Sequence, residues 1–496
     1  MELLAPAGGM EQLRAAVAFG ADAVYLAADR FGMRARAANF ALEDIPAAVT
    51  FAHEHGVKVH VTCNILMHPG DIDGLPDFFR TLDAAGVDAF IIGDLGAFAI
   101  AGEVASRVER HVSTQASVAN GAAARVWHSL GATRVVCARE MSLDDIRRLR
   151  EDAPADLQIE AFAHGAMCMA VSGRCLISSY LTGRSGNKGH CTQPCRWSYQ
   201  LGTSGGLKPA PTEGRGGVGG LKAAPTGSEV VLPAEPVGGG FSRPGGAGAE
   251  GGLKTAPTGG SWGEGQPGEF LLEEEKRPGE FFPIEEDGRG TFIMNAKDLN
   301  MLAHLCELAE VGVDSIKIEG RNKKAFYVAT VVGAYRRVLD GEAAEAVADE
   351  LLAVSHRPYG TGFYFNEAEQ AAAYDGYEQE TMHVADVIGC DDGRLHVLCR
   401  NRFAEGDQLE ILAPHEPSRT IRVRDLHWLN TFGPDNHDED APATPEEALA
   451  RATGTDWEAV ACANRSCNVY RIAVDAPVPP GSSLRMRTFR RSARHG

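Results

Sequence analysis

Long apolar runs and an excess of positive charge are both missing from this sequence. No stretch of 18 or more apolar residues occurs, so we expect no helix that crosses a membrane. The first nine residues, Met1 to Gly9, hold neither the basic segment nor the apolar segment of a secretory signal. These absences predict a cytoplasmic protein without membrane contact.

The formal net charge is −19, which argues against binding nucleic acid through bulk electrostatic attraction. A local basic patch remains a possible site of contact with nucleic acid, because the last twelve residues carry five arginines. They are Arg485, Arg487, Arg490, Arg491 and Arg494. The tail is a candidate contact for phosphate groups, although a solvated tail is the favoured interpretation.

Cysteines are the first strong signal, since four of the eleven fall within 28 residues. They are Cys168, Cys175, Cys191 and Cys195, with the spacing C-x6-C-x15-C-x3-C. A reducing compartment disfavours disulfides, and the C-x2-C pairs typical of zinc ribbons are absent here. The spacing suits an iron–sulfur cluster better. Zinc and unligated thiols remain alternatives at this point.

Short β-branched runs alternate with amphipathic helical stretches along the first 165 residues. The expected strands are Glu2–Ala5, Ala23–Ala27, Val57–Cys63, Ala89–Ile92, His111–Thr114, Arg134–Ala138 and Gln158–Ala163, with an eighth at Asp314–Glu319. Eight such units predict an α/β fold, a TIM-type (β/α)8 barrel, with its active site at the carboxyl ends of the strands. An open doubly wound sheet is the alternative.

Composition divides the rest of the chain. Residues 203–290 are rich in glycine and proline and are expected to be a disordered insertion. Alternating segments after Met382 predict a small C-terminal antiparallel β-barrel domain. The expected divisions are 1–202 (strands one to seven and the cysteines), 203–290, 291–380 (strand eight and closing helices), 381–430 (the β domain) and 431–496 (an acidic loop, further β segments and the tail).

The stretch Glu160-Ala-Phe-Ala-His164-Gly-Ala-Met-Cys168, continuing to Gly173-Arg-Cys175, resembles the signature of peptidase family U32. The phrases Cys191-Thr-Gln-Pro-Cys195-Arg-Trp and Lys317-Ile-Glu-Gly-Arg321 also resemble it. The resemblance covers residues 1–200, 291–365 and 382–425.

What this family resemblance implies is an iron–sulfur protein. Some members hydroxylate a tRNA wobble uridine or a ribosomal RNA cytidine without oxygen, using prephenate. It therefore implies a 4Fe–4S cluster, tRNA and a small-molecule donor as partners, and in some cases a second chain of the same family. Relatives often carry a further cysteine where Asn300 stands here. Cys195 is therefore the expected fourth ligand, with Cys306 or Cys63 as the fallback.

Several polar residues fall at or beyond predicted strand ends, where they would line the barrel mouth. They are Tyr25, Asn64, Gln115, Arg139, Glu140, His164, Glu319 and Arg321. Arg139 and Arg321 are candidates to bind a dicarboxylate such as prephenate. A structural ion pair between Arg321 and Glu319 is the alternative, and rim hydrogen bonds are the favoured role of Glu140 and Gln115.

A peptidase would need a nucleophile and a base. Cys168 and His164 are candidates, with Glu160 to orient the histidine. No Gly-x-Ser-x-Gly nucleophile elbow is expected, since that string occurs only in glycine-rich sequence at 202–206 and 259–263, and no His-Glu-x-x-His helix is present. The leading hypothesis is therefore an iron–sulfur tRNA hydroxylase, with His164, Glu160, Arg139, Glu319 and Arg321 as candidate catalytic residues. A U32-type peptidase and a non-catalytic cluster carrier within a complex are the alternatives.

Overall fold

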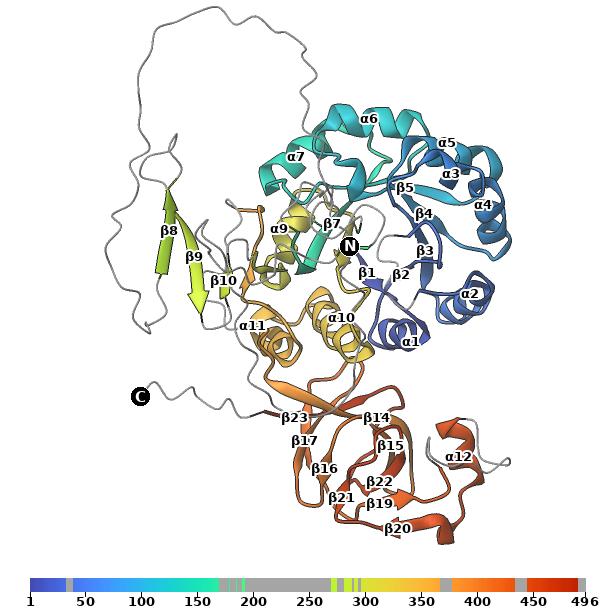
Figure 1. Ribbon diagram of the computed structural model, residues 1–496, viewed down its shortest axis with the longest axis vertical. Coiled ribbons are helices and arrows are strands. Elements are labelled where there is room, and N and C mark those ends of the chain that lie inside the picture. Colours follow the sequence, from blue (N-terminus) through green and yellow to red (C-terminus); the bar gives the residue numbers. More distant parts are fainter. Residues whose placement is uncertain are drawn as a thin grey trace, which may run out of the picture.

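The structure is a computed structural model, and two β-rich parts make up most of it (Figure 1). It describes residues 1–32, 39–168, 178, 184, 190–191, 269–273, 281–287, 290–292, 296–365, 377–432 and 444–488. The first part is a closed barrel, and the second is an antiparallel sheet near the C-terminus.

Eight parallel strands form the closed barrel. They are β1 (Glu2–Pro6), β2 (Ala23–Leu26), β3 (Lys58–Cys63), β4 (Ala89–Ile92), β5 (Glu109–Val112), β6 (Arg134–Val136), β7 (Gln158–Ala166) and β12 (Ser315–Ile318). Strand β12 closes the ring, because Ser315 is in register with both Glu2 of β1 and Glu160 of β7. The predicted TIM-type barrel is confirmed, and the open sheet is excluded.

Helices cover the outside of the barrel (Figure 1). They are α1 (Met10–Ala18), α2 (Ile45–Glu54), α3 (Pro69–Ile72), α4 (Leu75–Ala84), α5 (Leu95–Val104), α6 (Gly121–Ser129), α7 (Leu143–Asp152), α9 (Leu305–Glu310), α10 (Ala325–Leu339) and α11 (Ala344–Val347). Short 3-10 helices are η1 (Leu42–Asp44), η2 (Thr114–Ala116), η6 (Leu302–His304) and η7 (Ala348–Ala353). None of the helices in these ranges is long and apolar enough to cross a bilayer.

A repeated Gly-x-Asp phrase joins three helices to the strands that follow them. Gly20, Gly86 and Gly312 take φ angles of +91°, +81° and +85°, which favour glycine at the end of a helix. The aspartate two residues later accepts a backbone N–H from a neighbouring strand each time. The pairs are Asp22 with Leu3 (2.7 Å), Asp88 with Val59 (2.7 Å) and Asp314 with Ile159 (2.8 Å). The Gly-x-Asp motif therefore stabilises the turn after the helix and, through the aspartate, hydrogen-bonds the backbone of the adjacent strand.

Two different environments lie on the two faces of the barrel strands. The outward side chains join one large apolar core with the helices. Inside the barrel, a small apolar cluster contains Leu4, Ala23, Tyr25 and Ile91. Several other inward positions carry buried polar groups, among them Arg134 and Glu160. Because strand side chains alternate, each strand contributes to both environments.

Two short strands extend the barrel sheet, and three more form a separate sheet. Strand β11 (Asp298–Asn300) pairs antiparallel with β7, and β13 (Tyr359–Gly360) pairs with β11. A separate sheet contains β8 (Glu269–Glu273), β9 (Phe281–Asp287) and β10 (Gly290–Phe292). Strands β8 and β9 fall inside the predicted disordered insertion, so that prediction is wrong for those residues. The rest of 203–290, apart from Gly290 of β10, lies outside the described residues.

The C-terminal domain is an eight-stranded antiparallel sheet in the order β18-β17-β23-β14-β15-β22-β19-β20. Its strands are β14 (Thr381–Asp391), β15 (Arg394–Cys399), β17 (Gln408–Leu412), β18 (Arg419–Arg422), β19 (His427–Leu429), β20 (Trp457–Ala459), β22 (Val469–Ala473) and β23 (Ser483–Arg487). A small pair, β16 (Phe403–Ala404) with β21 (Cys462–Ala463), a helix α12 (Pro445–Arg451) and a 3-10 helix η8 (Gly454–Asp456) complete it. Strands β20, β22 and β23 lie after residue 430, where we expected further β segments, and they belong to the same sheet as the strands before it.

Strand β23 changes the interpretation of the arginine-rich tail. Arg485 is 2% exposed and lies 2.6 Å from the Glu350 carboxylate of η7 and 2.8 Å from that of Glu410 in β17. Arg487 pairs with the same Glu410 at 2.5 Å. These two arginines therefore belong to the folded domain and its contact with the barrel. Arg490, Arg491 and Arg494 lie outside the described residues.

Candidate active site at the barrel mouth

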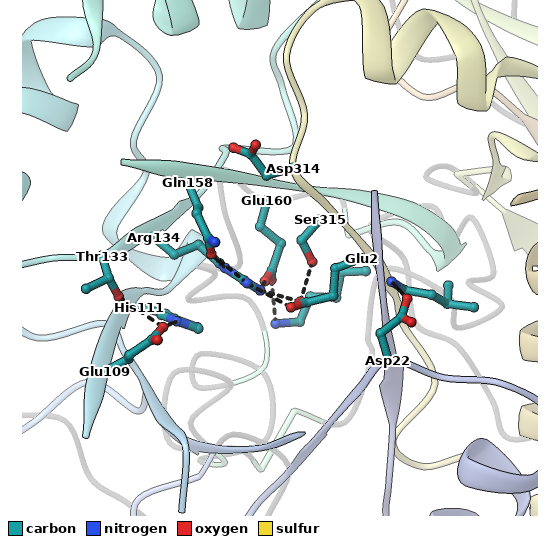
Figure 2. A network of polar contacts seen from close by, with 12 residues as sticks. Glu2, Asp22, Glu109, His111, Thr133, Arg134, Gln158, Glu160, Asp314 and Ser315 are labelled. Carbon is teal, nitrogen blue, oxygen red and sulfur yellow. Dashed lines mark hydrogen bonds and ion pairs between the residues drawn. The ribbon is translucent and has the colours of Figure 1, made fainter. Parts of the chain in front are cut away.

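A buried polar network occupies the amino-terminal half of the barrel (Figure 2). The Arg134 guanidinium lies at its centre. It donates to both carboxylate oxygens of Glu2 (2.6 and 3.0 Å), to Glu160 (3.0 Å) and to the Gln158 side chain (2.9 and 2.7 Å). Charges placed this deep need such partners, because burial without them is costly.

Glu160 uses both carboxylate oxygens inside this network. One accepts from Arg134, and the other accepts from the Lys317 ammonium at 3.0 Å. Burial favours the neutral acid, but the positive charges of Lys317 and Arg134 outweigh it and lower the pKa of Glu160. Glu160 is therefore an ionised structural partner of two cations.

Two histidines face this network from β3 and β5, on either side of β4. The rings of His60 and His111 meet edge to face at 4.8 Å, and His111 contacts Glu109 through Nε2 at 3.1 Å. Burial lowers the pKa of both histidines, and the positive charges nearby add to this effect for His60. Both rings are therefore neutral at pH 7. Sequence analysis singled out neither His111 nor Arg134, although their alternation along the strands marks them as inward-facing.

The barrel mouth gathers several predicted residues. Arg139 packs over the Phe162 ring at 3.8 Å, donates to the Ala166 carbonyl at 3.0 Å and lies 3.5 Å from the Glu319 carboxylate. Arg321 is 4% exposed and donates to the Thr62 hydroxyl at 3.0 Å. Two guanidinium groups therefore lie at the mouth. The Glu319 carboxylate, which we considered as a partner of Arg321, forms an ion pair with Arg139.

Tyr25 connects the mouth to the network below it. Its hydroxyl donates to the Ile318 carbonyl at 2.9 Å, and its ring lies 4.4 Å from the Lys317 ammonium. Asn64 and Gln115 lie just beyond the ends of β3 and β5, where the sequence placed them. The expectation of a polar rim at the carboxyl ends of the strands is thus met by these residues.

His164 points out of the barrel. The register between β7 and β12 shifts between Phe162 and His164, and this irregularity turns the histidine toward α10. Its Nδ1 lies 3.3 Å from the Tyr335 hydroxyl, and the rings of Tyr327, Tyr335 and Tyr359 surround it. Glu160 and His164 are consequently on opposite sides of the strand, and the predicted orienting contact between them is not formed.

Burial also decides the protonation of His164. It lowers the pKa to about 3, so the imidazole is neutral at pH 7 and a weak base. The same ring is closed off from solvent at 1% exposure, whereas Cys168 is exposed. This environment does not suit a histidine that activates a thiol nucleophile.

The cysteine segment starts where β7 ends, at the mouth. Cys168 and Cys191 are exposed, while Cys175 and Cys195 lie outside the described residues. Within the described ranges no three side chains are arranged to bind a metal ion. Exposed thiols at a strand end nevertheless suit the chemistry of an iron–sulfur cluster, which is held by thiolates.

The two fallback ligands differ. Cys63 is fully buried at the end of β3, and burial raises the pKa of its thiol, which disfavours the thiolate that a metal needs. Cys306 is exposed near the start of α9. Of the two, Cys306 is the better candidate.

A (β/α)8 barrel with a cysteine segment after its seventh strand, followed by an antiparallel β domain, defines the class of protein. The chain belongs to Peptidase family U32: the family matches residues 8–373, and the family's C-terminal domain matches residues 379–485.

Several relatives carry names that refer to RNA hydroxylation. The tRNA hydroxylation protein P of Escherichia coli is 35% identical over 83% of this chain and 86% of its own length. The tRNA hydroxylation protein P1 of Bacillus subtilis is 33% identical, with 86% of each chain covered. The 23S rRNA 5-hydroxycytidine C2501 synthase of Escherichia coli is 28% identical over 96% of this chain and 62% of its own length.

Proposed function

We propose that this protein hydroxylates a wobble uridine in tRNA without molecular oxygen. The observation that carries the proposal is the 35% identity to a tRNA hydroxylation protein across 83% of the chain. This similarity extends over more of the chain than the barrel alone. The proposal makes the chain an RNA-modifying enzyme of the U32 family.

Replacing a base C–H by C–OH is a two-electron oxidation, so the reaction needs both a source of the oxygen atom and an acceptor for two electrons and the displaced proton. We assign the oxygen source to prephenate, a dicarboxylate, and the electrons would leave through the cluster to an external one-electron acceptor in two steps. The two guanidinium groups at the mouth, Arg139 and Arg321, suit carboxylates through charge-assisted hydrogen bonds. Glu319, 3.5 Å from Arg139, would hold that arginine in place until the donor arrives.

A 4Fe–4S cluster held by Cys168, Cys175, Cys191 and Cys195 would supply the electron transfer. The cysteine segment begins at the carboxyl end of β7, which is the end where barrel enzymes carry out their chemistry. Arg139 donates to the Ala166 carbonyl two residues before Cys168, so the donor site and the thiols would be neighbours.

The peptidase alternative has less support. Its base would be His164, which is buried, neutral and turned toward Tyr335. Its orienting group would be Glu160, which is bound to Arg134 and Lys317. A nucleophile–base–orienter arrangement is therefore not found among these residues.

The test is mass analysis of tRNA from a strain that lacks the gene. We expect the wobble uridine to lose the mass of one oxygen atom, and plasmid-borne wild-type protein to restore it. The Arg321→Met variant should restore it poorly. Unchanged tRNA in the deletion strain would overturn the proposal, and gelatin cleavage by the purified protein that is lost in Cys168→Ala would favour the peptidase.

A further inference from the structure

A pocket opens beside the barrel mouth, at the carboxyl ends of β3, β4 and β5. Its volume is about 290 Å³, and Asn64, Gly93, Gln115 and Trp127 are among the residues that line it. Pockets for small ligands typically measure about 300–1,000 Å³, so this one suits a single ring system.

Two amide side chains give the pocket its polar edge. The Asn64 amide donates to the Ser113 hydroxyl at 3.4 Å, and the Gln115 backbone N–H donates to the same oxygen at 3.3 Å. Ser113, just after β5, therefore links this segment to the end of β3 across the intervening strand β4. A carboxamide offers a donor and an acceptor in one plane, which matches the hydrogen-bonding edge of a pyrimidine base.

The rest of the lining is mostly apolar, with Asp94 as its one charged residue. Trp127 of α6 meets Phe98 of α5 edge to face at 5.1 Å, which fixes the indole plane. Leu66 and Leu95, also in the lining, are 53% and 57% exposed, which is unusual for large apolar side chains. Single-stranded RNA is commonly bound by stacking its bases on such aromatic surfaces.

Gly93 keeps the pocket open. A Cβ atom at this position would lie 3.0 Å from Gln115 Cβ and 3.4 Å from the Asn64 carbonyl oxygen. A larger residue would thus push the two amide-bearing strand ends apart or fill the space between them. The absence of a side chain at the end of β4 is therefore part of the geometry of the pocket.

We propose that this pocket binds a pyrimidine base of the RNA substrate, turned out of its stack and held between Trp127 and the amides of Asn64 and Gln115. The inference rests on the proposed function, because it needs an RNA substrate. Enzymes that modify a base must expose it in this way, and a loop nucleotide can be turned out with little loss of stacking. A position beside the mouth would bring the base next to the cysteine segment.

Binding of synthetic anticodon stem-loop RNA to the purified protein tests this inference. The RNA carries either uridine or an abasic site at the wobble position, and fluorescence anisotropy gives the Kd. Trp127→Leu should bind the uridine RNA about 10- to 100-fold more weakly, the usual effect of losing one base–aromatic stack. It should bind the abasic RNA as wild type does. Trp127→Phe should recover most of the binding.

Gln115→Ala provides a second variant that does not disturb the apolar core, and it should also weaken uridine binding selectively. Leu130 caps the C-terminal end of the same helix α6 and is not part of the pocket lining. Leu130→Ala is therefore the matched control, and it should bind both RNAs as tightly as the wild type. Equal weakening for uridine and abasic RNA, or no weakening at all, would overturn the inference. If the deletion strain lacks the modification and both pocket variants restore it fully, the inference fails while the proposed function stands.

Discussion

The Lys317 ammonium lies 3.0 Å from the Glu160 carboxylate in the middle of the barrel, and both side chains are almost completely buried. Arg134 approaches the same carboxylate at 3.0 Å from the other side. Charged groups thus share the space that apolar residues fill in many barrels of this type. Glu160 compensates the buried Lys317 charge, and Glu160 and Glu2 together compensate that of Arg134.

Glu160→Gln should therefore destabilise the barrel strongly. The substitution leaves the buried Lys317 ammonium without its carboxylate partner, while Arg134 keeps Glu2, and breaking a buried ion pair in this way costs about 3–5 kcal/mol. Urea unfolding at pH 7 measures the loss. Asp77→Asn is the matched control, since its pair with Arg80 is 2.8 Å long but exposed, and its loss should cost below about 1 kcal/mol. Similar small losses for both variants would contradict the argument.

The barrel itself follows from local features of the sequence. The Gly-x-Asp motifs at Gly20, Gly86 and Gly312 combine a residue suited to positive φ with a carboxylate that accepts a backbone N–H from the adjacent, earlier strand, so helix ends and strand starts could be predicted. The polar rim could be predicted as well, because residues such as Asn64 and Gln115 follow the strands directly.

The orientation of individual site residues could not be predicted. Regular alternation would place Glu160 and His164 on the same face of β7, and only the register shift near Phe162 separates them. Arg485 likewise looked like part of a solvated tail, because its partner Glu350 is 135 residues away in sequence. Trp127 could not be assigned to a pocket, since its helix reaches the mouth only in the folded barrel.

His164 should make the protein sensitive to acid. Its pKa is about 3 in the folded state and about 6.5 when unfolded, so the unfolded chain binds the extra proton between these values. The contribution of neutral His164 to the free energy of unfolding is fully present above pH 6.5. It falls as the pH drops and is smaller by about 2 kcal/mol at pH 5. The difference in unfolding free energy between pH 7 and pH 5 should shrink by that amount in His164→Gln. The exposed His55→Gln should leave it unchanged, and an unaltered pH dependence in His164→Gln would contradict the buried, neutral state.

Arg485 should hold the C-terminal domain against the barrel. It is the buried link between Glu410 in its own domain and Glu350 in η7, whereas Arg487 pairs with Glu410 from an exposed position. Arg485→Met should lower the calorimetric unfolding temperature of the C-terminal domain by several degrees, because it removes the buried cation that the Glu350 and Glu410 carboxylates share. Arg487→Met is the control and should have a small effect. Equal shifts would mean that the buried contact between the domains contributes little.

The cysteine assignment leads to a prediction about iron content. Anaerobically purified wild-type protein should contain iron and acid-labile sulfide in equal amounts, as a 4Fe–4S cluster requires. Cys168→Ser, Cys175→Ser, Cys191→Ser and Cys195→Ser should each lose most of both, because a cluster with three thiolates is held less firmly. Cys306→Ser is the informative control: it is exposed near the start of α9 and should retain the cluster if Cys195 is the fourth ligand. Loss of iron in Cys306→Ser together with retention in Cys195→Ser would move the fourth ligand to α9. A colourless wild-type protein without iron would remove the cluster from the mechanism.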